Sequence, residues 1–538
     1  MRPLWPALAL LAGASFSFLA GELAAQVRFE EILRPPAENW LSYSGDYSGR
    51  RHSQLKQINT ANVGNVVSQW VYYIEGAKHL ECTPIVVNGV MYVTNSNEVH
   101  ALDARTGRRI WLYQDTRTAR KDVNRGVAVL DHRVFFVTGD AHLVALHATT
   151  GALLWDVEYA DVKRGYFATL APLALKDKVI VGVSGGDSGM RGFVAAYSAS
   201  TGEELWRFYT VPTTGEPGSE SWDKFPLEWA GAATWMTGTY DPELNLLFWP
   251  TGNPWPDFYG GDRQGDNLYS DSVVALNAAT GKLKWYFQFT PHDTHDWDAQ
   301  EFSVALDADW RGKPRKLLIH ANRNGFFYVL DRTNGQFLFG KPFVQKLNWA
   351  KGLNERGRPI VAPNTDPTPT GVEVCPSVRG ASNWMSPSYN PETRLFYVPT
   401  LEQCDTYTSS SRKPEPMKNF GGTGAEPKPN QVGQFYMRAL DPLTAEIRWE
   451  HPMPGPATMW TGTVSTAGGL VFAGDDDGHL IALDAKTGRD LWYFYTGQLL
   501  TASPITYMAG GKQYVAIATA TSIFSFALFE PQTAPGRP

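Results

Sequence analysis

Residues 101–111 read ALDARTGRRIW, and variants of this stretch recur along the chain. In each copy an apolar strand ends at the Asp position, the following turn reverses the chain, and a second strand begins with the aromatic residue. Glycine after threonine supplies the positive φ that such a turn needs. The other copies are ALHATTGALLW at 145–155, AYSASTGEELW at 196–206, ALNAATGKLKW at 275–285, a degenerate VLDRTNGQFLF at 329–339, ALDPLTAEIRW at 439–449 and ALDAKTGRDLW at 482–492.

The spacing of these copies predicts a β-propeller. Gaps of about 44, 51 and 43 residues between some successive copies match one four-stranded blade each. Each Trp would pack between neighbouring sheets and bury on the order of 200 Å². About 510 residues at roughly 45 to 65 per blade favour eight blades. We therefore predict an all-β, eight-bladed β-propeller with Trp-docking motifs, forming a single domain over residues 26–538. The Pro- and Gly-rich stretch 409–432 is predicted to be a long loop over one face.

The composition is that of a globular protein. Of 538 residues, 43% are hydrophobic and 19% are charged, and the net charge is -6. Nucleic-acid binders normally carry a basic face or stripe, so this balance argues against a nucleic-acid partner. Fifty Gly and 36 Pro favour short strands and turns over long helices.

The first 25 residues are typical of an export signal. Arg2 precedes an apolar segment at residues 7–20, and Ala24 and Ala25 offer a cleavage site. The alternative is a membrane anchor, but about 14 apolar residues fall short of the roughly 20 that span a bilayer. We therefore predict a periplasmic or otherwise extracytoplasmic protein, cleaved near Ala25, with no integral membrane segment.

The chain has three cysteines: Cys82, Cys375 and Cys404. In an oxidising compartment Cys375 and Cys404 could pair, and three buried free thiols are the alternative. The sequence contains no Cys-x-x-Cys-His motif, so we predict no c-type haem in this chain.

Several motifs carry chemistry: VNRG at 123–126, VSGGDSG at 183–189, GAATW at 231–235, TGNPW at 251–255 and THDWD at 294–298. Together with residues 39–63, they resemble the large subunit of the pyrroloquinoline-quinone (PQQ) alcohol dehydrogenases, the methanol and ethanol dehydrogenase family. The resemblance implies oxidation of an alcohol to an aldehyde or ketone by hydride transfer to metal-bound PQQ. It also implies a soluble cytochrome c as the electron acceptor.

The resemblance assigns the metal and the catalytic base. Asp296 corresponds to the base near the metal, where the chemistry needs a carboxylate to remove the hydroxyl proton. Asn253 and Asp187 correspond to metal ligands, although the family usually has Glu where Asp187 stands. Asp298 resembles the additional Asp of lanthanide-dependent enzymes, and a further carboxylate suits a trivalent ion. We therefore expect a lanthanide, with Ca²⁺ as the alternative and a solvent-facing loop residue as the other interpretation of Asp298.

The resemblance also implies the PQQ pocket. Trp235 corresponds to the tryptophan that stacks on the quinone, and Arg125 and Arg323 to arginines that hold its oxygens or carboxylates. The remaining pocket positions are Glu81, Thr169, Ser184, Gly185, Gly186, Asn383 and Trp460. The family's adjacent cysteines near VNRG are missing here, whereas the segment from Cys375 to Cys404 resembles one that a disulfide closes.

Two other functions remain open from the sequence. One is a dehydrogenase for bulkier secondary alcohols, polyols or sugars, because the cysteine ring is missing and the ligand at Asp187 is short. The other is a non-catalytic propeller that acts as a binding scaffold, like the outer-membrane assembly lipoprotein of that fold. The oligomeric state is also open, and a homodimer is included among the expected partners.

Overall fold

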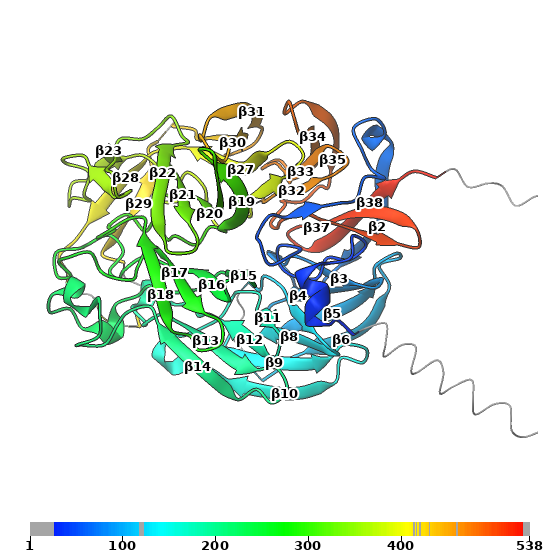
Figure 1. The fold of residues 1–538 in the computed structure, drawn as a ribbon, viewed down its shortest axis with the longest axis horizontal. Coiled ribbons are helices and arrows are strands. Elements are labelled where there is room, and N and C mark those ends of the chain that lie inside the picture. The colour runs from blue at the N-terminus through cyan, green and yellow to red at the C-terminus, as the bar shows by residue number, and fades with distance from the viewer. Residues whose placement is uncertain are drawn as a thin grey trace, which may run out of the picture.

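The computed structural model describes residues 26–117, 123–412, 415, 417–418, 421–429, 431–458 and 461–530. Antiparallel sheets are arranged in a ring around a central axis (Figure 1), and the predicted all-β propeller is confirmed. The predicted export signal, residues 1–25, lies outside the described residues. In the described part of the chain, no helix has the length and apolarity needed to cross a bilayer.

Within the described residues, the main strands form seven four-stranded sheets and one five-stranded sheet. In chain order these sheets are β3 (Ile85–Val87), β4 (Val90–Asn95), β5 (Glu98–Asp103) and β6 (Arg109–Gln114); β7 (Ala128–Leu130), β8 (Arg133–Val137), β9 (His142–His147) and β10 (Leu153–Glu158); β11 (Leu173–Leu175), β12 (Lys178–Val181), β13 (Phe193–Ser198) and β14 (Glu204–Tyr209); β15 (Thr239–Asp241), β16 (Leu246–Pro250), β17 (Ser272–Asn277) and β18 (Leu283–Gln288); β19 (Val304–Trp310), β20 (Lys313–Ala321), β21 (Phe326–Asp331) and β22 (Gln336–Pro342); β26 (Ser388–Asn390), β27 (Leu395–Glu402), β30 (Gln434–Leu440) and β31 (Ile447–Met453); β1 (His52–Ser53), β32 (Val464–Thr466), β33 (Leu470–Gly474), β34 (His479–Asp484) and β35 (Asp490–Tyr495); and β2 (Val66–Tyr73), β36 (Ile505–Ala509), β37 (Lys512–Ala518) and β38 (Ser522–Leu528).

The remaining elements are short. Two small sheets consist of β23 (Ala350–Leu353) with β24 (Pro359–Val361), and of β25 (Val372–Val374), β28 (Asp405–Ser409) and β29 (Thr423–Pro427). The helices are α2 (Phe29–Leu33), η1 (Val63–Asn65), η2 (Val162–Arg164), η3 (Gly186–Ser188), η4 (Ser219–Trp222) and η5 (Leu227–Trp229). The stretch 409–432 is therefore not only loop, because β29 lies within it and pairs with β28.

The two ends of the chain close the ring. Strand β2 pairs antiparallel with β38, so an early strand completes a sheet whose other three strands come last in the sequence. Figure 1 shows blue β2 beside red β38. Every second residue of β2 is exposed, as expected for a strand with one face toward the core. Because unfolding of this sheet must separate distant segments, the closure couples the two ends.

The repeated tryptophans bridge successive sheets. The indole N–H of Trp111 donates to the carbonyl of Ala148 at 3.0 Å, and the ring packs on Gly151 of the next repeat. A Cβ on Gly151 would lie 2.7 Å from the Trp111 ring, and φ is +70° there. Only glycine satisfies both conditions without strain. The same N–H to carbonyl contact occurs for Trp70 with Ala104, Trp155 with Ala199, Trp206 with Ala278, Trp449 with Ala485 and Trp492 with Val66.

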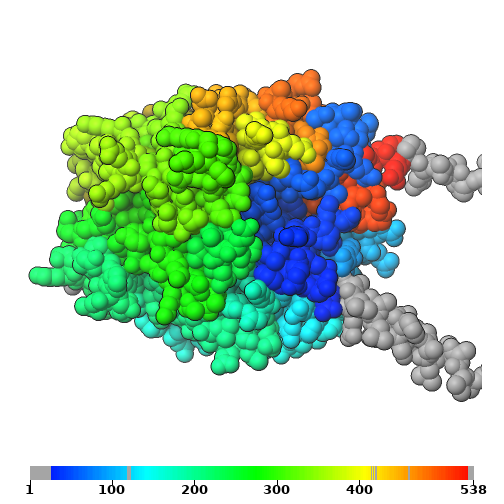
Figure 2. Space-filling model, viewed as in Figure 1, coloured from blue at the N-terminus to red at the C-terminus, as the bar shows by residue number. Residues whose placement is uncertain are grey.

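An N-terminal segment crosses one face of the ring. Backbone carbonyls of residues 47–51 accept hydrogen bonds from Tyr240 of β15, Ala305 of β19, Tyr389 of β26 and Ser465 of β32. The segment therefore joins four successive sheets. Figure 2 shows N-terminal residues, in dark blue, on the visible surface of the molecule. A cavity of about 740 Å³ lies beside this segment, and none of the predicted site residues lines it.

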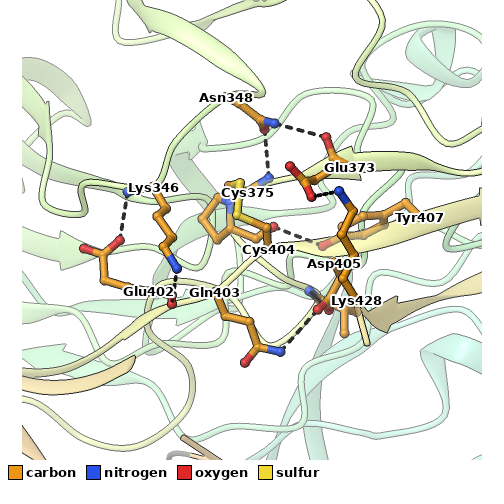
Figure 3. The surroundings of a disulfide bond; sticks show 12 residues. Lys346, Asn348, Glu373, Cys375, Glu402, Gln403, Cys404, Asp405, Tyr407 and Lys428 are labelled. Atoms are coloured by element: carbon orange, nitrogen blue, oxygen red, sulfur yellow. Dashed lines mark hydrogen bonds and ion pairs between the residues drawn. A yellow bond between two sulfur atoms is a disulfide. The ribbon is translucent and has the colours of Figure 1, made fainter. Parts of the chain in front are cut away.

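The predicted disulfide between Cys375 and Cys404 is confirmed. It links the end of β25 to the connection between β27 and β28, and Asn348 accepts the backbone N–H of Cys375 at 2.8 Å (Figure 3). The next residues of this loop lead to Val378, whose carbonyl accepts from the guanidinium of Arg323. Cys82 is buried and free, and burial raises the pKa of its thiol to about 11.

We expect the double variant Cys375→Ala/Cys404→Ala to unfold more easily. Opening the crosslink restores conformational freedom to the unfolded chain, and the expected loss is about 2 to 4 kcal/mol in the free energy of unfolding. Chemical denaturation of the oxidised wild type and the variant measures this loss, and reduced wild type serves as the matched control. A variant as stable as the oxidised wild type would contradict the prediction.

Candidate functional site

The loop between β18 and β19 carries the predicted base. Asp293 folds this loop, because its carboxylate accepts the backbone N–H groups of His295 at 3.0 Å and Trp297 at 2.8 Å. Asp296 lies between those two donors and has a φ of 59°. Such a left-handed conformation is uncommon outside glycine and clusters at functional positions. His295 stacks on Trp297, and its Nε2 contacts the carbonyl of Thr365, so this ring belongs to the support of the loop.

Asp298 joins the base loop to two other predicted residues. Its Oδ1 accepts the backbone N–H of Asn253 at 3.0 Å, and its Oδ2 accepts from the guanidinium of Arg323 at 2.9 Å. Gly252 packs against the same carboxylate so closely that a Cβ there would collide with Oδ1. Asp298 is therefore buried and fixed by hydrogen bonds, and its interpretation as a solvent-facing loop residue is wrong. Gly252 was not predicted from the sequence, since only the tertiary contact gives it a role.

Asn253 and Asp187 approach from two further loops. The side-chain N–H₂ of Asn253 donates to Oδ1 of Asp257 at 2.7 Å, and the Asp257 side chain is buried. Asp187 lies in the single turn η3, between Gly185 and Gly189, which both have positive φ. Asp257 was missed by sequence reasoning. It follows Asn253 by four residues, across Pro-Trp-Pro, and no local motif distinguishes it.

Arg125 organises a second group of predicted residues. Its guanidinium pairs with the Glu81 carboxylate at 2.6 Å and donates to the Thr169 hydroxyl at 2.7 Å. The same guanidinium lies 4.9 Å from the ring centre of Trp235 and 4.7 Å from that of Trp384. Thr169 in turn contacts the hydroxyl of Ser184 at 3.1 Å. Trp384 was not predicted, although it follows Asn383 directly.

Trp235 lies between the two groups. Its ring packs against Arg125 at 4.9 Å, and burial raises the pKa of Asp298 while the Trp235 side chain is a smaller influence that lowers it. Asn383 is less involved, since its amide donates to the carbonyl of Arg379 and accepts the N–H of Trp384. Gly185 and Gly186 form the turn before Asp187, and a Cβ on Gly186 would lie 3.1 Å from Ala233. Trp460 lies outside the described residues.

Comparison with known proteins agrees with this arrangement. Residues 40–345 and 436–515 match the family described as "PQQ: Glucose/ethanol/alcohol dehydrogenase, beta-propeller domain". The chain belongs to this family. The quinoprotein alcohol dehydrogenase PedH of Pseudomonas putida is 39% identical over 96% of this chain and 91% of its own length. A quinohemoprotein alcohol dehydrogenase of Comamonas testosteroni is 39% identical over 89% of this chain and 72% of its own length.

Solved structures give the same assignment. A quinohemoprotein alcohol dehydrogenase from Comamonas testosteroni superposes with a TM-score of 0.88 at 34% identity, covering 96% of this chain and 85% of that chain. A europium-containing methanol dehydrogenase superposes with a TM-score of 0.86 at 32% identity, covering 93% of this chain and all of that chain. The protein is thus a PQQ-dependent oxidoreductase of the alcohol dehydrogenase type.

The carboxylates of this quinoprotein site repel one another. Burial is the first cause that raises the pKa of Asp187, Asp257, Asp296 and Asp298, and the charges of neighbouring carboxylates raise it further for Asp257, Asp296 and Asp298. The Asp187 side chain is exposed and that of Asp296 is partly exposed. The surrounding protein nevertheless desolvates both carboxyl groups, which raises their pKa values. Arg323 is the cation that most opposes these shifts for Asp187, Asp296 and Asp298.

This donor chemistry fits a hard, highly charged cation. Within the described residues, no three His, Cys, Asp or Glu side chains converge as a ready set of metal ligands. The carboxylate and amide oxygens are nevertheless the ligand types that hard cations take. Their repulsion leaves an excess of negative charge that a cation would relieve.

The Arg125 group fits an acceptor-rich planar cofactor. The buried Nε atoms of Arg125 and Arg323 have no hydrogen-bond acceptor among the described residues. Buried donors without partners are costly, and the carboxylates and carbonyls of PQQ are acceptors that would satisfy them. Trp235 and Trp384 add two aromatic rings beside Arg125.

We expect the metal-free protein to lose stability as the pH rises from 5 to 7. Burial and charge repulsion raise the pKa of Asp298 from 3.8 to about 6, against the opposing charge of Arg323. The folded state therefore keeps a proton that the unfolded state has released, and this advantage disappears as the pH passes the folded pKa. The expected loss is on the order of 1 to 3 kcal/mol in the free energy of unfolding.

Chemical denaturation of the metal-free protein at pH 5 and pH 7 measures this dependence. The variant Asp298→Asn should lose part of it, and saturating La³⁺ should remove it because the added positive charge favours the ionised carboxylates. Stability that increases between pH 5 and pH 7 in the metal-free wild type would contradict the sign.

Proposed function

We propose that this protein is an exported quinoprotein that oxidises an alcohol to an aldehyde or ketone, using PQQ and one metal ion held in a single propeller domain over residues 26–538. Residues 1–25 would be removed near Ala25 on export to the periplasm. The observation that carries the proposal is the position of Trp235. This residue packs against Arg125 and acts on the Asp298 carboxylate, which supports a cofactor site and a metal site that lie side by side.

We also propose that the eight main sheets are the eight blades of the propeller. The repeated tryptophan contacts support this assignment, because each one ties a strand of one sheet to the turn of the next. In this interpretation the contact of Trp111 with Ala148 and Gly151 is a Trp-docking motif. Such ties between neighbouring blades keep the central loops at constant positions around the axis.

Asp187, Asn253, Asp296 and Asp298 would hold the metal, and Glu81, Arg125, Thr169, Ser184, Gly185, Gly186, Trp235, Arg323, Asn383 and Trp460 would surround the cofactor. The four Asp carboxylates, including Asp257, face few positive charges, so a trivalent lanthanide is favoured over Ca²⁺. The charges of Asp187, Asp257 and Asp298 all raise the pKa of Asp296. Positive charge at the metal position opposes this repulsion and keeps Asp296 ionised.

Asp296 acts as the general base. Its ionised carboxylate accepts the hydroxyl proton of the alcohol while the carbon–hydrogen bond breaks, so that no free alkoxide is needed. PQQ supplies the two-electron oxidising chemistry when it is bound. Arg323 fixes the neighbouring Asp298 and limits the total negative charge. A soluble cytochrome c would receive the electrons.

The test is dye-linked alcohol oxidation by metal-free apo-protein that receives PQQ with either La³⁺ or Ca²⁺, over a panel of primary and secondary alcohols. Turnover with La³⁺ and not with Ca²⁺ would support the lanthanide assignment. Turnover with Ca²⁺ alone would keep the enzymatic function and overturn the metal preference. Failure to bind PQQ, measured by its absorption after gel filtration, would overturn the proposed function.

A further inference from the structure

Asp257 is a buried carboxylate beside the site that the proposed reaction does not yet use. It follows Asn253 by four residues, across the sequence Pro-Trp-Pro, and only 5% of its surface is exposed. Its Oδ1 accepts the side-chain N–H₂ of Asn253 at 2.7 Å. A carboxylate oxygen that accepts a hydrogen bond needs a donor, and in the Asn253 side chain only the amide nitrogen supplies one.

All the remaining polar groups of Asn253, except one, also form hydrogen bonds. The backbone N–H donates to Asp298 at 3.0 Å, and the backbone carbonyl accepts from Ala232 at 2.8 Å. The second amide hydrogen faces the carbonyl of Pro254 at 3.4 Å. The side-chain oxygen is thus the one polar atom of Asn253 that has no hydrogen bond to a described residue. This is the atom type that a hard cation binds.

The surroundings of Asp257 prevent it from turning away. Gly421 packs against its other carboxylate oxygen, and a Cβ at that position would collide with Oδ2. The backbone N–H of Phe258 donates to the carbonyl of Gly421 at 2.6 Å, which holds the two segments together. Gly421 belongs to the connection between β28 and β29, so a distant part of the chain closes over this side of the site.

We propose that Asp257 is a positioning residue of the metal site, which turns the Asn253 amide oxygen toward the cation and adds a further negative charge that favours a trivalent ion. This inference rests on the proposed function, because it needs a cation between Asn253, Asp187 and Asp298. The charges of Asp187 and Asp298 act on Asp257, and Asn253 is its direct hydrogen-bond partner. Arg263 is the nearby cation that partly offsets the added charge.

The two parts of this role are separable by mutation. Asp257→Asn keeps an oxygen that accepts from the Asn253 amide but removes the charge, whereas Asp257→Ala removes both. Coulomb energy is proportional to the charge of the ion. Loss of one negative charge from the site therefore weakens the binding of a trivalent ion more than that of a divalent one. Loss of the ligand's orientation weakens the binding of both ions. Removal of a residue that orients a metal ligand typically lowers the metal affinity by about 10- to 100-fold.

The experiment titrates full-length metal-free protein with Tb³⁺, measures the luminescence sensitised by tryptophan, and then competes with La³⁺ and Ca²⁺. Asp257→Asn should lower the affinity for La³⁺ by about 10-fold and that for Ca²⁺ by less, while Asp257→Ala should lower both by about 10- to 100-fold. Asp490→Asn, an exposed acid at the start of β35, is the matched control and should bind as the wild type does.

Stability separates positioning from a merely structural role. Because Asp257 is repelled by neighbouring carboxylates, metal-free Asp257→Asn should unfold at the same denaturant concentration as the wild type or at a higher one. A loss of stability that parallels the loss of affinity in both variants would overturn the inference. Wild-type affinity in both variants would overturn it as well, with the proposed function intact. A wild-type protein that binds none of the three ions would overturn both.

Discussion

Replacement of Asp296 by Asn should lower the turnover of the reconstituted enzyme by about 10²- to 10⁴-fold, the range that a positioned general base contributes. The substitution conserves size and removes the proton acceptor. The structure supports this size of effect, because Asp296 has a left-handed φ and the charges of Arg323, Asp187 and Asp298 act on its carboxylate. Steady-state dye reduction at saturating PQQ and La³⁺ measures the change.

Two controls isolate the chemical step. The absorption of bound PQQ in Asp296→Asn should match that of the wild type at saturating La³⁺, since the Arg125 group is unchanged. Asp490→Asn should keep full turnover. If Asp296→Asn retained more than a tenth of the wild-type rate with its site loaded, another group would have to accept the proton.

Replacement of Arg323 by Leu should destabilise the metal-free protein by about 3 to 5 kcal/mol, because removal of one partner leaves buried charge without compensation. Arg323 is 6% exposed and donates a hydrogen bond to Asp298, and the charges of Asp296, Asp298 and Glu301 all act on it. The pKa values of these three acids should therefore increase further in the variant. Chemical denaturation at pH 7 measures the loss.

Arg323→Lys should lose less stability, because it keeps the charge without the planar fork. Arg489→Leu, at an exposed arginine in the turn before β35, is the matched control and should change stability little. La³⁺ should restore part of the stability of Arg323→Leu, since it replaces the missing positive charge. Equal stability of Arg323→Leu and wild type at pH 7 would show that the carboxylates are neutral there.

Local signals were sufficient for the architecture. Gly107 has a positive φ in the turn, and Trp111 lies in the next strand, β6, between two exposed neighbours, so both features stand within residues 101–111. Their recurrence predicted a propeller because each repeat can bury its tryptophan only against the next. The disulfide depended on residues farther apart in the chain. Spacing allowed Cys375 and Cys404 to pair, and the structure brings them together.

The candidate site could be predicted only where a motif marked it. Asp296, Asp298, Asn253 and Arg125 stand in short, distinctive stretches, and the structure brings them into two groups linked by Trp235. Gly252, Trp384 and Asp257 carried no such mark. Their roles come from contacts with residues far away in the chain, such as Gly421 against Asp257.

The sequence by itself thus determined the repeat, the turns, the strands and the residue types available for chemistry, because these depend on neighbours within a few positions. Only the tertiary structure decided which of the many acids are buried together, which donors lack acceptors and which way the Asn253 amide faces. Burial and charge repulsion act through space, and their strength depends on distances between loops from different sheets. The spacing of residues along the chain does not contain those distances.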